Sequence, residues 1–72
     1  MQLCKFHELV EMLPLYVPQN AVIVEAGAFN GGDTIRLKTI FPESTIHAFE
    51  PVPASYERLI AKVSQSASVY TY

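Results

Sequence analysis

Two acidic residues accompany a glycine-rich stretch in a pattern suited to binding a nucleoside. Glu25 closes an apolar run, Gly27, Gly31 and Gly32 follow within six positions of one another, and Glu50 closes a second apolar run. Gly27 and Glu50 are 23 positions apart (50 − 27), close to the offset of about 20 residues at which an acid meets ribose in Rossmann folds. A carboxylate there can accept two charge-assisted hydrogen bonds from vicinal ribose hydroxyls. Glu50 is therefore the strongest candidate for a ligand-binding residue.

The glycine spacing favours a ligand without a diphosphate. A dinucleotide turn of the G-x-G-x-x-G type would place glycines at 27, 29 and 32, because the middle glycine lets the backbone approach the pyrophosphate. Phe29 occupies that middle position. S-adenosylmethionine has no phosphate and carries a cationic sulfonium, so Glu25 would contribute negative potential near it while Glu50 holds the ribose. Backbone N–H groups of the turn and of the following helix can meet the methionine carboxylate.

Several of these residues also have purely structural interpretations. Glu25 is equally well explained as an acceptor for the backbone amides of the turn. Asp33 and Thr34 are predicted to be helix caps first and ligand contacts second. Phe29 either packs under the turn or borders the ligand, and the sequence leaves both alternatives open.

The first half of the chain is predicted to contain a helix, a strand and a second helix. Segment 2–13 has apolar residues at helical spacing, and Pro14 ends the pattern. Residues 21–26 form an apolar, β-branched run typical of a strand that is covered on both faces. After the glycine turn, 35–41 is predicted to be helical, with Pro42 closing the helix.

The second half repeats the alternation of strand and helix. Residues 45–50 have strand composition, and Pro53 fits the first position of a helix. His47 lies inside that strand, where a hydrogen-bonded core histidine is a better interpretation than a general base. Segment 69–72 is predicted to open a third strand. The core-facing stripe of the last helix is predicted to be Tyr56, Leu59, Ile60 and Val63.

This order predicts an α/β fold, a partial Rossmann-like parallel sheet with right-handed crossovers. We expect residues 1–20 to form an N-terminal helix and connector, and residues 21–72 to be the first part of a cofactor-binding domain. A parallel sheet of two or three strands leaves apolar edges and faces open. We therefore expect the chain to be a truncated first part of a longer protein, able to self-associate through an exposed sheet edge.

At these residues the sequence resembles FkbM-type S-adenosylmethionine-dependent methyltransferases, which are class I, Rossmann-like enzymes. The resemblance covers residues 21–63 and rests on the patterns E-x-G-A-x-x-G-x-x-T at 25–34 and FEP-x-P at 49–53. It implies methyl transfer from S-adenosylmethionine, typically to an oxygen of a small molecule or sugar. In the family the catalytic residues and the acceptor site belong to later strands that have no counterpart here. No catalytic residue is therefore assigned, and the chain alone is expected to be inactive.

The resemblance also implies roles for individual residues. Glu25, Gly27 and Gly31 would belong to the cofactor loop, and Glu50 would bind the ribose. The family often has Asn where Phe29 and Val52 stand in this chain. Asn30 can replace the first of these in a polar contact of the loop. The full predicted cofactor-binding set is Glu25, Gly27, Ala28, Phe29, Asn30, Gly31, Thr34 and Glu50.

Composition excludes several other classes of protein. With 72 residues, 50% of them hydrophobic and 17% charged, the chain is one small folded unit rather than a disordered segment. A formal net charge of −2 gives no basic surface for nucleic acid or an anionic membrane. No apolar run approaches the roughly 20 residues that span a bilayer, and no signal peptide is present, so a cytoplasmic location is expected.

A metal or disulfide site is also not predicted. Cys4 is the single cysteine, so one chain can form neither an internal disulfide nor a cysteine-rich zinc site. His7 and Glu11 are four positions apart on the first predicted helix, but a pair lacks the three or four ligands of a stable site.

Two competing functions remain open. A nicotinamide-dependent oxidoreductase would share the role of Glu50, and tighter binding of NAD than of S-adenosylmethionine would favour it. A non-catalytic interaction remnant would use its open sheet edge to recruit another chain. Self-association without any cofactor binding would favour that interpretation.

Overall fold

The computed structural model describes residues 12–72 of the chain. Segment 2–11 of the first predicted helix lies outside these residues, and at its end Leu13 begins a short 3-10 turn that contains Pro14. In the part that is described, no helix is long and apolar enough to cross a membrane. The elements are η1 (Leu13–Leu15), β1 (Val22–Ala26), α2 (Gly32–Ile40), β2 (Thr45–Phe49), α3 (Pro53–Val63) and β3 (Val69–Thr71).

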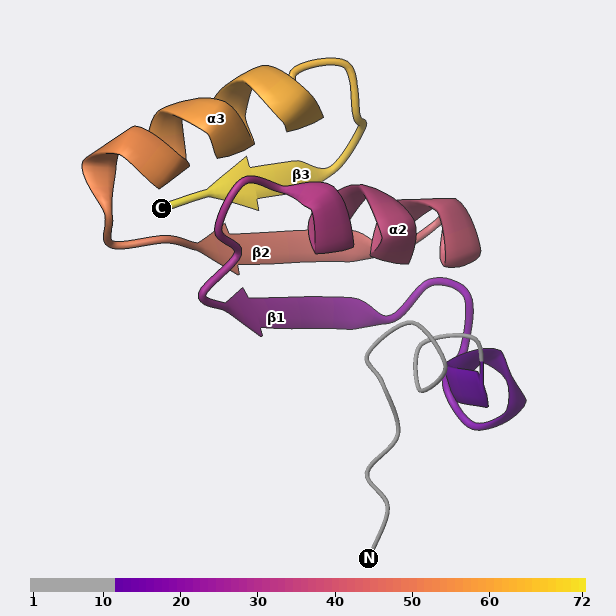
Figure 1. Ribbon diagram of the computed structural model, residues 1–72. Coiled ribbons are helices and arrows are strands. Elements are labelled where there is room, and N and C mark those ends of the chain that lie inside the picture. The colour runs from indigo at the N-terminus through magenta and orange to yellow at the C-terminus, as the bar shows by residue number, and fades with distance from the viewer. Residues whose placement is uncertain (1–11) are drawn as a thin grey trace, which may run out of the picture.

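The three strands form one parallel sheet in the order β1-β2-β3. In Figure 1 the three arrows point the same way, and each helix connects one strand to the next. The register places Ile23 beside Ile46, and Ile46 beside Val69. The predicted α/β class and parallel sheet are therefore confirmed, and the arrangement is consistent with a partial Rossmann-like fold.

Both helices lie on the same face of the sheet. The two crossovers step in one direction, from β1 to β2 to β3, and right-handed connections then put both helices on one side. Helices α2 and α3 contact each other above β2, and their inward side chains join the strand residues in one core. The buried members of this core are Ala28, Leu37, Ile46, Ala48, Leu59 and Val63.

No described helix covers the opposite face, which we call the open face. Alternation along each strand assigns to it the side chains of Val22, Val24, Ala26, Thr45, His47, Phe49, Tyr70 and Tyr72. Val22 and Val24 are 69% and 70% exposed, so the prediction that the first strand is covered on both faces is wrong for the described residues. His47 likewise lies on this face and not in the core, where its Nδ1 is hydrogen-bonded to the Tyr72 hydroxyl at 3.0 Å.

Helix α3 begins where it was predicted and faces the core with most of its predicted stripe. Pro53 is its first residue, because the missing N–H of proline is no loss at that position. Leu59 and Val63 are buried, while Ile60 is 43% exposed. The prediction for Ile60 is therefore wrong, since the inward face of α3 is narrower than the apolar stripe.

Candidate cofactor site

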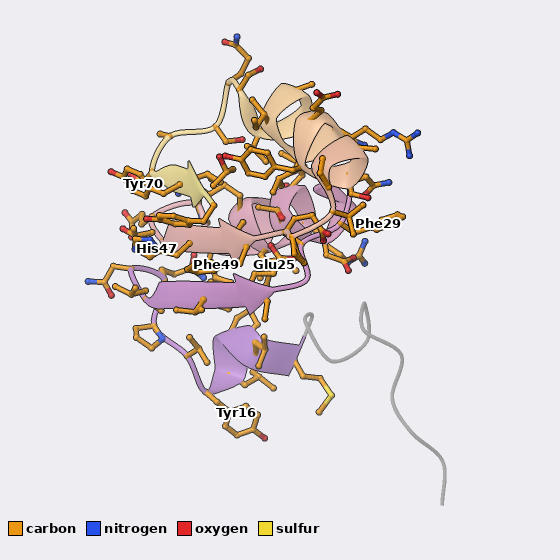
Figure 2. All side chains as sticks on the ribbon, turned by 90° about the vertical axis from the view of Figure 1, so that its left-hand side faces the viewer. Tyr16, Glu25, Phe29, His47, Phe49 and Tyr70 are labelled. Atoms are coloured by element: carbon orange, nitrogen blue, oxygen red, sulfur yellow. The ribbon has the colours of Figure 1, made fainter. Side chains whose placement is uncertain are left out.

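The glycine loop and Glu50 meet at the edge of the sheet where the parallel strands end. Figure 2 looks onto this edge. The loop follows β1 directly and Glu50 follows β2 directly, so both come to the side where ligands bind in open α/β sheets. The Phe29 N–H donates to Glu50 Oε1 at 2.7 Å. The geometry that the proposed ribose contact requires is therefore present.

The Glu50 carboxylate joins the loop to the start of α3. Its Oε2 accepts a hydrogen bond from the Val52 N–H at 3.0 Å, two residues along the chain. The side chain of Glu50 is only 8% exposed. Sequence reasoning missed this use of Val52, whose side chain attracted attention although its backbone makes the contact. The short separation of Glu50 from Pro53 was the available signal, because a helix that begins at Pro53 brings the preceding amide close to the acid.

Most backbone amides of the loop already have partners within the protein. The Gly27 and Ala28 N–H groups both donate to the Phe49 carbonyl, at 2.8 and 2.9 Å. The Gly31 N–H donates to the Ala28 carbonyl at 3.0 Å, and the Gly32 N–H donates to Asn30 Oδ1 at 3.0 Å. The loop is thus held by internal hydrogen bonds and does not present these amides to an anion.

The loop turns through left-handed backbone conformations at alternate residues. Gly27, Phe29 and Gly31 have φ of 75°, 56° and 88°. Phe29 is unusual, because a bulky residue seldom adopts positive φ. Its side chain is 58% exposed and points away from the sheet in Figure 2, whereas Ala28 is buried in the core. Of the two alternatives for Phe29, packing under the turn is therefore wrong, and the ring stands beside the mouth of the loop.

Thr34 has a different structural role from the one predicted. Helix α2 begins at Gly32 with Gly31 as its N-cap, and Asp33 lies in its first turn. Thr34 is consequently inside the helix, fully buried, and its hydroxyl donates to Glu25 Oε1 at 2.5 Å. The predicted capping by Asp33 or Thr34 is wrong because the left-handed Gly31 starts the helix earlier.

Glu25 is a half-buried acid on the helix-covered side of β1. Burial raises its pKa above the ordinary value of 4.5; the hydrogen bond from Thr34 opposes this rise, and the charge of Asp33 adds to it. A cation beside Glu25 would favour the ionised form. The site therefore has a carboxylate that gains from a positively charged ligand.

The raised pKa of Glu25 predicts a pH dependence of stability. The folded protein holds the Glu25 proton to higher pH than the unfolded chain, so folding stability falls as pH rises from 4.5 through the folded pKa. In Glu25→Gln this part of the fall is expected to disappear, while the Thr34 hydroxyl keeps an acceptor. Urea unfolding of both proteins across a pH series measures the difference, and parallel curves would contradict the prediction.

Gly31 is required for packing as well as for conformation. A Cβ at this position would lie 3.1 Å from Leu59 Cδ1 and 3.3 Å from Lys62 Cβ. Positive φ alone costs an alanine about 1–2 kcal/mol, and crowding adds to that cost, so Gly31→Ala is expected to lose roughly 2–4 kcal/mol of unfolding free energy. Gly27→Ala is the matched control, because its added Cβ meets nothing within 4 Å. Equal losses in thermal or urea unfolding would contradict the packing role.

Comparison with known proteins gives one partial match. No protein-family model matches the chain. Over 39 residues the chain is 46% identical to Methyltransferase 1 of Beauveria bassiana (strain ARSEF 2860). The match covers 54% of this chain and 16% of that protein, so the chain spans about one sixth of its curated relative. This similarity supports a methyltransferase in general terms.

Proposed function

We propose that this chain is the cofactor-binding segment of an S-adenosylmethionine-dependent methyltransferase of the FkbM type. The observation that carries the proposal is the position of the Glu50 carboxylate, bonded to the glycine loop at the carboxyl edge of a parallel sheet. The partial likeness to a protein named as a methyltransferase supports the same class.

The Glu50 carboxylate retains the capacity to bind a ribose. Each of its oxygens accepts one backbone N–H, from Phe29 or from Val52. An ionised carboxylate has about four acceptor sites, so two remain for the vicinal hydroxyls. The two backbone bonds also fix the orientation of the carboxylate before a ligand arrives, which lowers the entropic cost of binding.

The loop favours a ligand without phosphates. A diphosphate needs a close approach to free backbone amides, but the Gly27, Ala28, Phe29, Gly31 and Gly32 amides all donate to acceptors within the chain. The prediction that the turn's own amides meet the methionine carboxylate is therefore narrowed to the first turn of α2. NAD is disfavoured by the same hydrogen bonds.

The electrostatics of the site fit a cationic methyl donor. Glu25 and Glu50 flank the loop, and the pKa of Glu25 is raised by burial. A sulfonium or ammonium group near Glu25 would stabilise its carboxylate and partly offset its desolvation. S-adenosylmethionine combines that positive charge with an adenosine, so it suits both acids at once.

In the proposed reaction the residues of this chain hold the donor. An acceptor oxygen attacks the methyl carbon in line, the carbon–sulfur bond breaks, the sulfonium leaves as a neutral thioether, and the acceptor proton goes to a base. Catalysis of this kind depends largely on holding donor and acceptor in near-attack geometry. We assign the acceptor site and the base to regions beyond these 72 residues, and the acceptor to a small molecule or sugar.

Titration calorimetry of the 72-residue chain tests the proposed ligand. S-adenosylmethionine is expected to bind more tightly than NAD, and Glu43→Ala, which removes an exposed acid outside the site, should leave that affinity unchanged. Tighter binding of NAD would overturn the proposal in favour of an oxidoreductase segment.

A labelled-methyl assay tests the predicted inactivity. Purified chain, isotopically labelled S-adenosylmethionine and a panel of small hydroxylated acceptors are expected to yield little or no labelled product. Robust transfer by the chain alone would contradict the assignment of the base and acceptor site to other regions.

A further inference from the structure

The open face is the largest apolar surface that the described fold leaves uncovered. On the side of the sheet away from α2 and α3, Figure 2 shows Tyr70 and His47 projecting outward. His47 stacks on Tyr70 with ring centroids 5.4 Å apart and on Tyr72 at 5.9 Å, and Phe49 stacks on Tyr72 at 4.6 Å. These four rings form a continuous ridge over β2 and β3.

The open face carries no acidic or basic side chain other than His47. Each Asp, Glu, Lys and Arg in residues 12–72 belongs to a loop, a helix or the helix-covered side of β1. Such a face has no charge to offer a charged partner, and it meets no like-charge repulsion when it is placed against itself. This distribution favours a second copy of the same chain as the occupant.

The relief of the open face is self-complementary. Its β2–β3 side is high, because the stacked rings stand there, and its β1 side is low, because it presents Val22, Val24 and Ala26. A two-fold axis that runs along β2 would place β3 of one copy over β1 of the other. The ring ridge of each copy would then lie over the low aliphatic strip of its partner, as an isologous contact requires.

The exposed area is sufficient for such a contact. Phe49, Tyr70 and Tyr72 are each about half exposed, and aromatic side chains bury roughly 150–250 Å² each, so the rings alone offer roughly 300 Å² per copy. With Val22 and Val24 the face approaches roughly 500 Å² per copy, about the lower limit of a specific interface.

We infer that the open face is a homodimer interface in which two sheets stack face to face about an axis along β2. The inference goes beyond the proposed cofactor role and does not depend on it, because the site lies at the carboxyl edge of the sheet. It also differs from the pairing of β1 edges expected from sequence, since the side chains and not the strand backbones would form this contact.

Sedimentation of the 72-residue chain over a concentration series tests the inference. A monomer–dimer equilibrium is expected, and Val24→Asp and Tyr70→Asp should each raise the dimer Kd by about tenfold or more, because a buried unpaired charge is strongly unfavourable. Leu15→Asp is the matched control, since Leu15 is 75% exposed on η1. Circular dichroism checks that each variant is folded. Monomers at all concentrations, or equal effects of the three variants, would overturn the inference.

Thiol cross-linking distinguishes face stacking from edge pairing. Stacked sheets lie about 10 Å apart, so β2 would face β2 of the partner, whereas the two β1 strands would be on the order of 14 Å apart. In a Cys4→Ser background, His47→Cys should therefore be joined efficiently by a short bis-maleimide and Val24→Cys poorly. The reverse pattern would indicate edge pairing and overturn the stacked arrangement. Unchanged S-adenosylmethionine binding in Tyr70→Asp would show that the interface and the cofactor site are separate.

Discussion

Glu50→Ala is expected to weaken S-adenosylmethionine binding by about 100-fold or more. Two charge-assisted hydrogen bonds to the ribose would be lost, each worth roughly 1.5–3 kcal/mol. The substitution also removes the acceptor for the Phe29 and Val52 amides. Two donors without a protein partner are expected to lower the free energy of unfolding by about 2–4 kcal/mol.

Two comparisons separate lost binding from lost folding. Glu50→Gln keeps the size of the side chain and one carbonyl acceptor, so it should retain more stability than Glu50→Ala while still binding the cofactor poorly. Glu43→Ala removes an exposed acid of the return loop and should change neither property. Calorimetric titration and urea unfolding of all three variants provide the data. Wild-type affinity in folded Glu50→Gln would show that the charge of Glu50 does not hold the ribose.

Leu59→Ala is expected to cause the largest loss of stability of any single core truncation on α3. Leu59 is fully buried and lies against the position where a Cβ of Gly31 would be, so it supports the glycine loop from below. Truncating a buried leucine typically costs about 2–5 kcal/mol. A 72-residue domain has roughly 4–11 kcal/mol in total at the usual stability per residue, so a large unfolded population is expected at 37 °C.

The neighbouring residue supplies the control for this prediction. Ile60 follows Leu59 on α3 but is partly exposed, so Ile60→Ala should cost only about 1 kcal/mol. Thermal and urea unfolding compare the two variants directly. A loss in Ile60→Ala as large as that in Leu59→Ala would mean that the inward face of α3 is assigned incorrectly.

Local sequence patterns predicted the elements that depend on local chemistry. The β-branched run at 21–26 forms β1, Pro53 starts α3, and the run at 69–72 forms β3. Each of these follows from neighbouring residues alone, because proline geometry and β-branching act within a few positions. The order of strand and helix then determined the parallel sheet, since connections of this length are right-handed.

The errors concern contacts between distant parts of the chain. Thr34 was predicted to be a cap, but it bonds Glu25 nine positions away, and the left-handed conformation of Gly31 that starts α2 reflects its close packing on α3. The contact between Phe29 and Glu50 spans 21 positions and could be anticipated only as a neighbourhood, from the strand ends. The exposure of Val24 and His47 depends on which face the helices cover, and periodicity within one strand does not determine that.

The most direct test of the cofactor proposal is a ¹H–¹⁵N NMR titration of the 72-residue chain with S-adenosylmethionine. The account predicts that the largest amide shifts are those of Phe29 and Val52, whose N–H groups donate to the Glu50 carboxylate, with smaller shifts on α3 away from its start. Saturable shifts elsewhere that leave both amides unchanged, or no shift at millimolar ligand, would contradict binding of the ribose at Glu50.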